Sequence, residues 1–134
     1  RIAQRRAAAS GSRARFQSGD VFTHVAPAGG YPTVLDFGVL HQFSPDQLPR
    51  YVDHLARLVA PGGSLLLQCF SDAARTRAPG PRPIERAELE RTFTGRWRLA
   101  ALERCEYLTR ERPYPAWFAW VRLDPCAAPV ASPA

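Results

Sequence analysis

The sequence predicts an α/β protein, in which helices alternate with strands of a largely parallel sheet. Two observations carry this prediction. A strongly amphipathic helix over residues 44–59 leads into the apolar run of residues 64–70, which is the pattern of a helix feeding a buried strand. A second helix over residues 84–93 is followed by two segments of alternating apolar residues, which predict a C-terminal hairpin.

The N-terminal third predicts one helix end and two strands. Residues 1–10 are rich in arginine and alanine, which are strong helix formers, and a Ser-Gly-Ser break follows them. Residues 14–18 alternate around an aromatic side chain and meet a turn at Asp20, so they predict a short strand. Residues 31–35 predict a buried strand that ends at Asp36.

The helix over residues 44–59 has the clearest local signals in the chain. Ser44 suits the N-cap, Pro45 the first helical position, and Gln47 completes a capping box. The apolar residues then recur at the spacing of one helix face. A Pro-Gly-Gly sequence after residue 60 predicts the break before the strand over residues 64–70, which we expect to be buried on both faces.

The C-terminal half predicts a surface loop over residues 73–83 and a final strand over residues 116–123. In that strand the aromatic side chains of Trp117 and Trp120 point to opposite faces, so we expect both faces to be covered and the strand not to be a sheet edge. The domain is expected to span residues 1–123, with residues 124–134 as a disordered tail.

The composition of the chain argues against several classes of protein, among them nucleic-acid-binding, membrane and disulfide-rich proteins. Five of the 18 arginines lie in the first 19 residues, which hold no acid, and the remaining 115 residues are nearly neutral, so nucleic-acid binding has little support. No apolar run is long enough for a membrane span or a signal peptide, which favours the cytoplasm. The three cysteines form neither a disulfide framework nor a metal-ligand pattern.

Three segments resemble a known family: FQSGD at residues 16–20, YPTVLDFGVLHQFS at residues 31–44, and YVDHLARLVAPGGSLLLQCFSD at residues 51–72. Together they are similar to the C-terminal two thirds of class I S-adenosylmethionine-dependent methyltransferases, in particular the bacterial group of methyltransferase-domain or thiopurine-methyltransferase-like proteins. The resemblance places the family's glycine-rich motif and first two strands upstream of Arg1. The sequence is therefore expected to be a fragment of a longer enzyme.

The resemblance implies a partial Rossmann-like, doubly wound sheet whose last strand is antiparallel and lies beside residues 65–67. S-adenosylmethionine would sit beyond the carboxyl ends of the strands. In the family, the positions that match Asp20 and Val21 contact the adenine, and those that match Asp36 and Phe37 face the methionine part and the acceptor. We therefore expect these four residues to bind the cofactor.

Three histidines are candidates for proton transfer. His41 lies between a strand and a helix, where a general base could stand, although a histidine at such a position is more often structural. His24 and His54 are predicted to be solvated.

The function expected from the resemblance is transfer of a methyl group to a small-molecule acceptor, with no metal. Two alternatives stay open at this point. The chain could be a non-catalytic remnant of the fold that binds a protein through an exposed sheet edge. A nucleic-acid methyltransferase is the weaker alternative and depends on the arginines near the N-terminus.

Overall fold

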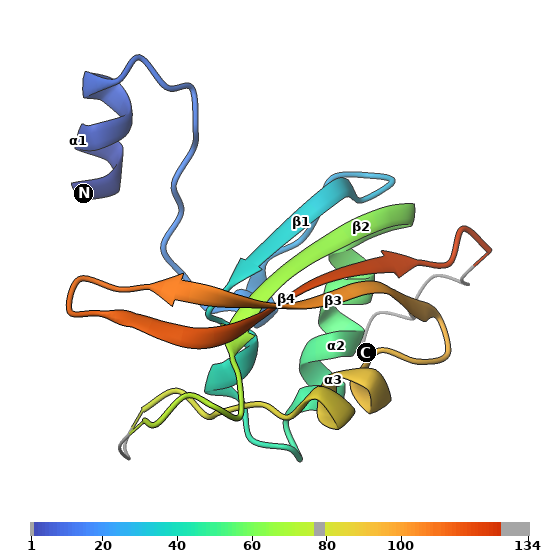
Figure 1. Cartoon of the computed structure of the whole chain (residues 1–134). Coiled ribbons are helices and arrows are strands. Elements are labelled where there is room, and N and C mark those ends of the chain that lie inside the picture. Colours follow the sequence, from blue (N-terminus) through green and yellow to red (C-terminus); the bar gives the residue numbers. More distant parts are fainter. Residues whose placement is uncertain (1, 77–79, 127–134) are drawn as a thin grey trace.

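The computed structural model describes residues 2–76 and 80–126, whose four strands form one mixed sheet of order β1-β2-β4-β3 (Figure 1). The elements in chain order are α1 (Ile2–Ala9), η1 (Val21–Thr23), β1 (Tyr31–Phe37), η2 (Leu40–Gln42), α2 (Leu48–Leu58), β2 (Val59–Phe70), α3 (Arg86–Thr92), β3 (Trp97–Leu108) and β4 (Pro113–Leu123). The predicted α/β class is confirmed.

Strand β4 lies inside the sheet, between β2 and β3, and is antiparallel to both. Leu65 of β2 pairs with Val121 of β4, while β1 runs parallel to β2 on its other side. The expected antiparallel insertion of the last strand is therefore confirmed, and the edges of this sheet are β1 and β3.

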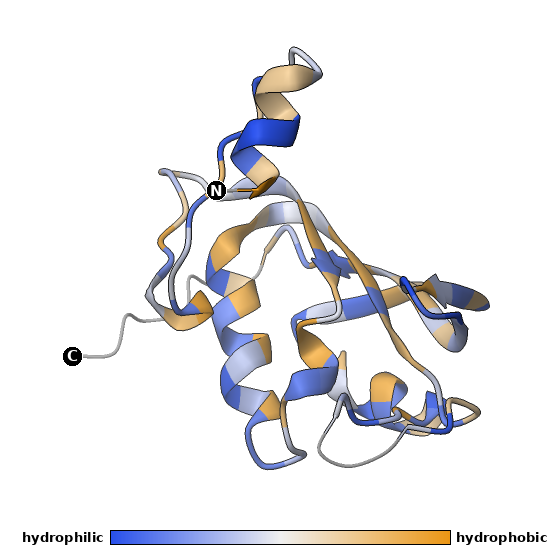
Figure 2. Cartoon of the chain, turned by 90° about the vertical axis from the view of Figure 1, so that its left-hand side faces the viewer, coloured by the Kyte–Doolittle hydropathy of each residue, from blue (hydrophilic) through white to orange (hydrophobic). Residues whose placement is uncertain are grey.

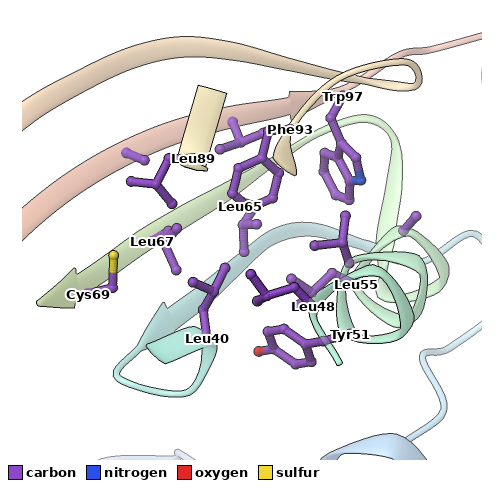
Figure 3. Packing of buried hydrophobic residues seen from close by; sticks show 14 of the residues in the cluster. Leu40, Leu48, Tyr51, Leu55, Leu65, Leu67, Cys69, Leu89, Phe93 and Trp97 are labelled. Carbon is purple, nitrogen blue, oxygen red and sulfur yellow. The ribbon is translucent and has the colours of Figure 1, made fainter. Parts of the chain in front are cut away.

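Helices α2 and α3 cover the same face of the sheet, and the core lies between them and the strands (Figures 1 and 3). Leu65, Leu67 and Cys69 alternate along β2 and are buried on this face. Leu55 and Tyr51 of α2 and Leu89 of α3 complete the cluster. The one-sided core follows from the period of two in β2 and the apolar stripe of α2.

The opposite face of the sheet is largely open in the described part of the chain. Leu35 and Phe37 of β1 are 59% and 53% exposed, and Trp120 of β4 is 41% exposed. The prediction that residues 64–70 and 116–123 are buried on both faces was therefore wrong. Its physical cause is the placement of α2 and α3 on one side, since no other described element covers the second face.

Helix α2 begins three residues later than the capping pattern suggests, and β2 begins earlier. The backbone N–H of Ser44 donates to Oε1 of Gln47, which is half of the predicted capping box, but residues 45–47 form a turn before the helix. Strand β2 starts directly after α2 and includes the predicted Pro-Gly-Gly break. The sheet accommodates it because the register shifts between Tyr31 and Thr33, which pair with Val59 and Ser64.

The N-terminal segment stands away from the sheet. Helix α1 confirms the predicted helix, has no buried residue and lies apart from the body in both views (Figures 1 and 2). The strand predicted over residues 14–18 is wrong: these residues are in no strand, and Phe16 is 45% exposed. No described strand lies beside them to complete a ladder.

The C-terminal elements agree with the sequence apart from their bounds. Helix α3 starts at Arg86 and not at residue 84, because the backbone of Ile84 forms a bridge to Ser71 at the end of β2. The described residues of the loop over 73–83 have no helix or strand before Ile84, as expected. Residues 127–134 of the predicted tail lie outside the described residues. Within the described ranges no helix is long and apolar enough to cross a membrane.

Candidate functional site

The carboxyl ends of the parallel strands β1 and β2 meet at one edge of the sheet. Asp36 and Phe37 of β1 pair with Leu67 and Gln68 of β2. The turns that follow the two strands are joined directly, because the backbone N–H of Arg82 donates to the carbonyl of His41 over 2.8 Å. Asp36, Phe37 and His41, three of the residues that the sequence predicted for the site, all lie at this edge.

Asp36 is buried, with 2% of its surface exposed, and its carboxylate faces the helix side. Oδ1 accepts from the backbone N–H of Val39 at 2.8 Å, Oδ2 accepts from the phenol of Tyr51 at 2.8 Å, and the N–H of Leu40 reaches both oxygens. Burial raises the pKa of this carboxyl, while the three donors oppose the shift. Its carboxylate therefore holds the turn after β1 and does not point into open solvent.

Phe37 has the opposite orientation. Because side chains alternate along a strand, the ring lies on the uncovered face of the sheet and is more than half exposed. Its carbonyl accepts a 3.2 Å hydrogen bond from the phenol of Tyr107, which comes from the far strand β3. The long β3–β4 hairpin thus contributes a side chain to the end of β1, which no local pattern in the sequence indicated.

Gly38 makes that close approach possible. Its φ of +89° is a backbone conformation that favours glycine, and a Cβ at this position would lie 2.5 Å from the Tyr107 hydroxyl. The same Cβ would lie 3.3 Å from Nε2 of His41. The site edge is therefore closely packed around a glycine that no larger residue could replace without displacement.

His41 is buried, with 3% of its surface exposed. Its Nδ1 accepts a 3.0 Å hydrogen bond from the backbone N–H of Phe70, the last residue of β2. The imidazole packs against the rings of Phe70 and Tyr107, with centroids 4.6 and 5.9 Å away, and these two rings also contact each other. Burial lowers the pKa of His41 to about 4, against a hydrogen bond with the Gly38 backbone that favours the protonated ring. His41 is therefore neutral at pH 7.

Asp20 lies on a different segment and is exposed. It is the N-cap of the short helix η1, where Oδ1 accepts from the backbone N–H of Phe22 at 2.9 Å. Among the described residues its other carboxylate oxygen has no hydrogen-bond donor, so it is free to accept from a ligand. Val21, the neighbouring residue, is half-buried and packs against the core.

Phe22 links the Asp20 segment to the rest of the site. Its ring packs edge-on against Tyr51 at 6.2 Å and against His54 at 5.6 Å, and the guanidinium of Arg50 lies 4.2 Å from its centroid. Since Tyr51 in turn donates to Asp36, two hydrogen bonds and one aromatic contact connect Asp20 with the end of β1. The two segments that hold the four predicted cofactor-binding residues are therefore in contact through Phe22 and Tyr51.

The predictions for the other two histidines were wrong. His54 is buried beneath Phe22, because the docked η1 segment covers the side of α2 that was predicted to face solvent. Its burial lowers its pKa. His24 is half-buried and its Nε2 lies 3.1 Å from the phenol oxygen of Tyr31.

Two residues of the site were missed by the sequence analysis. Tyr51 was assigned to the apolar face of its helix, although its hydroxyl needs a buried partner and Asp36 was a candidate for it. Arg82 was assigned to a surface loop. Its guanidinium makes a two-pronged contact with Glu88 at 2.9 and 2.7 Å and donates to the carbonyl of Phe43 at 3.2 Å, which fixes this loop over the turn after β1.

A groove of about 700 Å³ lies elsewhere, between α2 and the segment that joins α3 to β3. It is lined by residues that include Leu48, Asp53, Arg91 and Trp97. None of the predicted site residues lines it, so the groove is separate from the edge of the sheet described above.

The family model described as Thiopurine S-methyltransferase (TPMT) matches residues 2–118. A comparison with curated protein sequences gave no significant match.

Solved structures share the fold at low sequence identity. A SAM-dependent methyltransferase from Methanosarcina mazei is 12% identical with a TM-score of 0.70, over 84% of this chain and 68% of that one. The 1,6-didemethyltoxoflavin-N1-methyltransferase of Burkholderia thailandensis, solved with bound 1,6-didemethyltoxoflavin and S-adenosylhomocysteine, is 18% identical with a TM-score of 0.65, over 90% of this chain and 56% of that one. The SpnF cyclase is 16% identical with a TM-score of 0.71, over 92% and 61%.

The chain spans about three fifths of the length of these solved structures. Their likeness shows the fold, which confirms the Rossmann-like sheet that the resemblance implied. The family model goes further, because it matches most of the residues of the chain by sequence. The chain therefore belongs to the thiopurine S-methyltransferase family.

Proposed function

We propose that this chain is part of an enzyme that transfers a methyl group from S-adenosylmethionine to a small-molecule acceptor. The observation that carries the proposal is the family match over residues 2–118. It is supported by the position of the candidate residues at the carboxyl ends of parallel strands, where folds of this kind bind ligands.

Asp20 fits the adenine end of the cofactor. Its side chain is exposed, one carboxylate oxygen is already held by the η1 backbone, and the second is available as an acceptor. A carboxylate acceptor suits the exocyclic amine of adenine, which is a donor. The backbone of Val21 would flank the ring, because this residue follows Asp20 directly at the start of η1.

The end of β1 fits the methionine part and the acceptor. The exposed ring of Phe37 offers an apolar wall, and Asp36 acts behind it by holding the following turn through Val39 and Leu40. Asp36 thus supports this part of the site through the backbone.

The bound cofactor would supply an activated methyl group on a sulfonium, so the protein needs to place the acceptor in line and exclude water. The residues of this chain can meet that need without a nucleophile. Phe37 and Tyr107 form the apolar side of the strand end, and Arg82 fixes the loop above it.

The proposal is tested by calorimetry, in which S-adenosylhomocysteine is titrated into the natural protein and into its Asp20→Asn variant. Asparagine keeps the Oδ1 cap on Phe22 but presents an NH₂ donor to the adenine amine, so we expect binding to weaken at least about tenfold. Asp46→Asn is the matched control, since Asp46 is an exposed aspartate outside the site. Unchanged affinity in Asp20→Asn would remove Asp20 from the adenine contact.

The alternative of a non-catalytic interaction module is favoured by one observation. Leu35 and Phe37 of the edge strand β1, and Trp120 of β4, are exposed on the uncovered face of the sheet. If the wild-type protein binds no S-adenosylhomocysteine, and if Leu35→Ser abolishes the capture of a protein partner, this second function replaces the first.

A further inference from the structure

We propose that His41 is a positioning residue. Its imidazole takes the place of a backbone carbonyl at the end of the β1–β2 ladder and so holds the turn after β1 against the last residue of β2. This role differs from the general base that the sequence suggested. It rests on the proposed function in one respect, because the strand end that His41 holds is where the acceptor would lie.

The ladder between β1 and β2 ends at a defined point. The backbone N–H of Gly38 donates to the carbonyl of Gln68 over 3.0 Å, and the chain then turns away from β2. Amide groups two residues apart in a strand point to the same side, so the N–H of Phe70 points toward the place that β1 has left. A buried amide without a partner is costly, and His41 supplies the missing acceptor through Nδ1.

This hydrogen bond fixes the tautomer of the ring. A neutral imidazole has one nitrogen that accepts and one that donates. Because Nδ1 accepts from Phe70, the proton of the neutral ring is on Nε2. The lone pair that a general base would need is therefore already used, and the other nitrogen has none to offer.

The ring is also held on its remaining sides. The rings of Phe70 and Tyr107 pack against it at tilted angles, and Gly38 lies so close to Nε2 that a Cβ there would be 3.3 Å away. The backbone carbonyl of His41 accepts from Arg82 in the loop after β2. One residue thus joins the turn after β1, the last residue of β2 and the loop beyond it.

The first test uses the unmodified protein and no methyl transfer. In ¹⁵N-labelled protein, two-bond nitrogen–proton correlations report the tautomer and protonation of each histidine ring. We expect His41 to show the Nε2–H form unchanged from pH 8 to pH 5.5, while the half-buried His24 serves as the internal reference. An Nδ1–H form, or a titration of His41 near its ordinary pKa of 6.5, would overturn the proposal.

The second test separates an acceptor from a base. In His41→Asn the side-chain oxygen stands where Nδ1 stood, so the amide of Phe70 keeps an acceptor although the variant can take up no proton. In His41→Phe the ring volume is kept and the acceptor is lost. We expect hydrogen exchange of the Phe70 amide to be within about twofold of wild type in the first variant and at least about tenfold faster in the second. His24→Asn is the matched control.

The outcomes are distinct. If His41→Asn and His41→Phe expose the Phe70 amide equally, the acceptor role is refuted. Where methyl transfer is measurable, a positioning role predicts that His41→Asn keeps the pH profile of kcat, whereas a base predicts that both variants lose activity equally. If the wild-type protein transfers no methyl group, the proposed function fails, and the tautomer and exchange results still decide the role of His41.

Discussion

The phenol of Tyr51 in α2 donates a 2.8 Å hydrogen bond to Oδ2 of Asp36, the penultimate residue of β1. Both residues are almost fully buried. A carboxylate in such a place is unfavourable unless donors surround it, and here one phenol and two backbone amides do so. The helix in the core and the strand end at the candidate site are therefore coupled by a polar contact within an apolar layer.

Tyr51→Phe is expected to lower the free energy of unfolding by about 1–3 kcal/mol, because it removes the only side-chain donor that the described part of the chain offers to a buried carboxylate and leaves Oδ2 with the Leu40 amide alone. Urea denaturation of wild type and variant would measure this. Tyr31→Phe is the control: its hydroxyl contacts the half-buried His24, so its loss should cost less than about 1 kcal/mol. Equal losses in the two variants would mean that Asp36 needs no third donor.

Gly38→Ala is expected to destabilise the protein more than Gly29→Ala. Both glycines have positive φ, +89° and +86°, so both alanine variants carry the backbone strain of about 1–2 kcal/mol. At Gly38 the new Cβ also meets the Tyr107 hydroxyl, whereas at Gly29 it meets nothing within 4 Å. The two melting temperatures are measured, and the difference between their decreases gives the cost of the contact between the new Cβ and the Tyr107 hydroxyl.

The same experiment in the Tyr107→Phe background provides the check on that contact. Removing the hydroxyl removes the nearest atom to the new Cβ, so Gly38→Ala should cost less there than in wild type. If Gly38→Ala destabilises both backgrounds equally, the Tyr107 hydroxyl does not limit the space at Gly38.

The contact between Arg82 and Glu88 is expected to show a coupling free energy of about 0.5–1 kcal/mol in a double-mutant cycle of Arg82→Lys and Glu88→Gln. The two side chains are 27% and 20% exposed and meet through two parallel hydrogen bonds, which lysine cannot form. The exposed pair Arg86 and Glu90 on α3 is the control, with an expected coupling near 0.3 kcal/mol. If the two cycles give the same coupling free energy, the Arg82–Glu88 contact stabilises the loop over residues 80–83 no more than an exposed ion pair would.

Stability is expected to fall as the pH drops from about 6.5 to about 4, partly through His41. Its pKa is about 4 in the folded protein and 6.5 ordinarily, so the unfolded chain binds the proton first and acid favours unfolding. At about 1.36 kcal/mol per pKa unit the contribution is at most about 3 kcal/mol, complete above pH 6.5 and lost as the pH reaches 4.

The contribution of His41 is separated from those of His54 and Asp36 by repeating the pH series with His41→Asn, which has no titrating ring. The lowered pKa of His54 acts in the same direction, and the raised pKa of Asp36 acts in the opposite one. We expect the difference in unfolding free energy between wild type and variant to shrink below pH 6.5. A constant difference would show that His41 titrates alike in both states.

The parts of the fold that could be predicted from the sequence are those with local signals. The apolar spacing in α2 and the nearly continuous apolar residues 64–70 of β2 identified both elements. Strand β4 was correctly predicted not to be an edge strand, although its second face is not covered as that prediction assumed. The bounds were less accurate. The start of α3, for example, depends on the bridge between Ile84 and Ser71, and a contact of that kind has no local pattern.

For the candidate site, the sequence predicted where the residues lie along the strands but not what their side chains contact. The sequence placed Asp36 at the end of a strand, yet which face of that strand the helices would cover was not encoded locally, and this choice decides that Asp36 is buried and Phe37 exposed. In the same way, the partner of His41 is an amide 29 positions later in the chain. The Phe70 amide can donate to His41 only because β1 turns away from β2 before reaching it, and the sequence does not show where that happens.

The strand order has a consequence for how the chain folds. The β3–β4 hairpin can close from its turn, because Leu108 and Pro113 pair at its tip, whereas Leu65 must find Val121 across half of the chain. Contacts distant in sequence form late, since they require the closure of larger loops. The hairpin is therefore expected to form first and to offer β4 as the template for β2. Tyr107 would then already be in place when β1 arrives, and the turn around Gly38 would close against it.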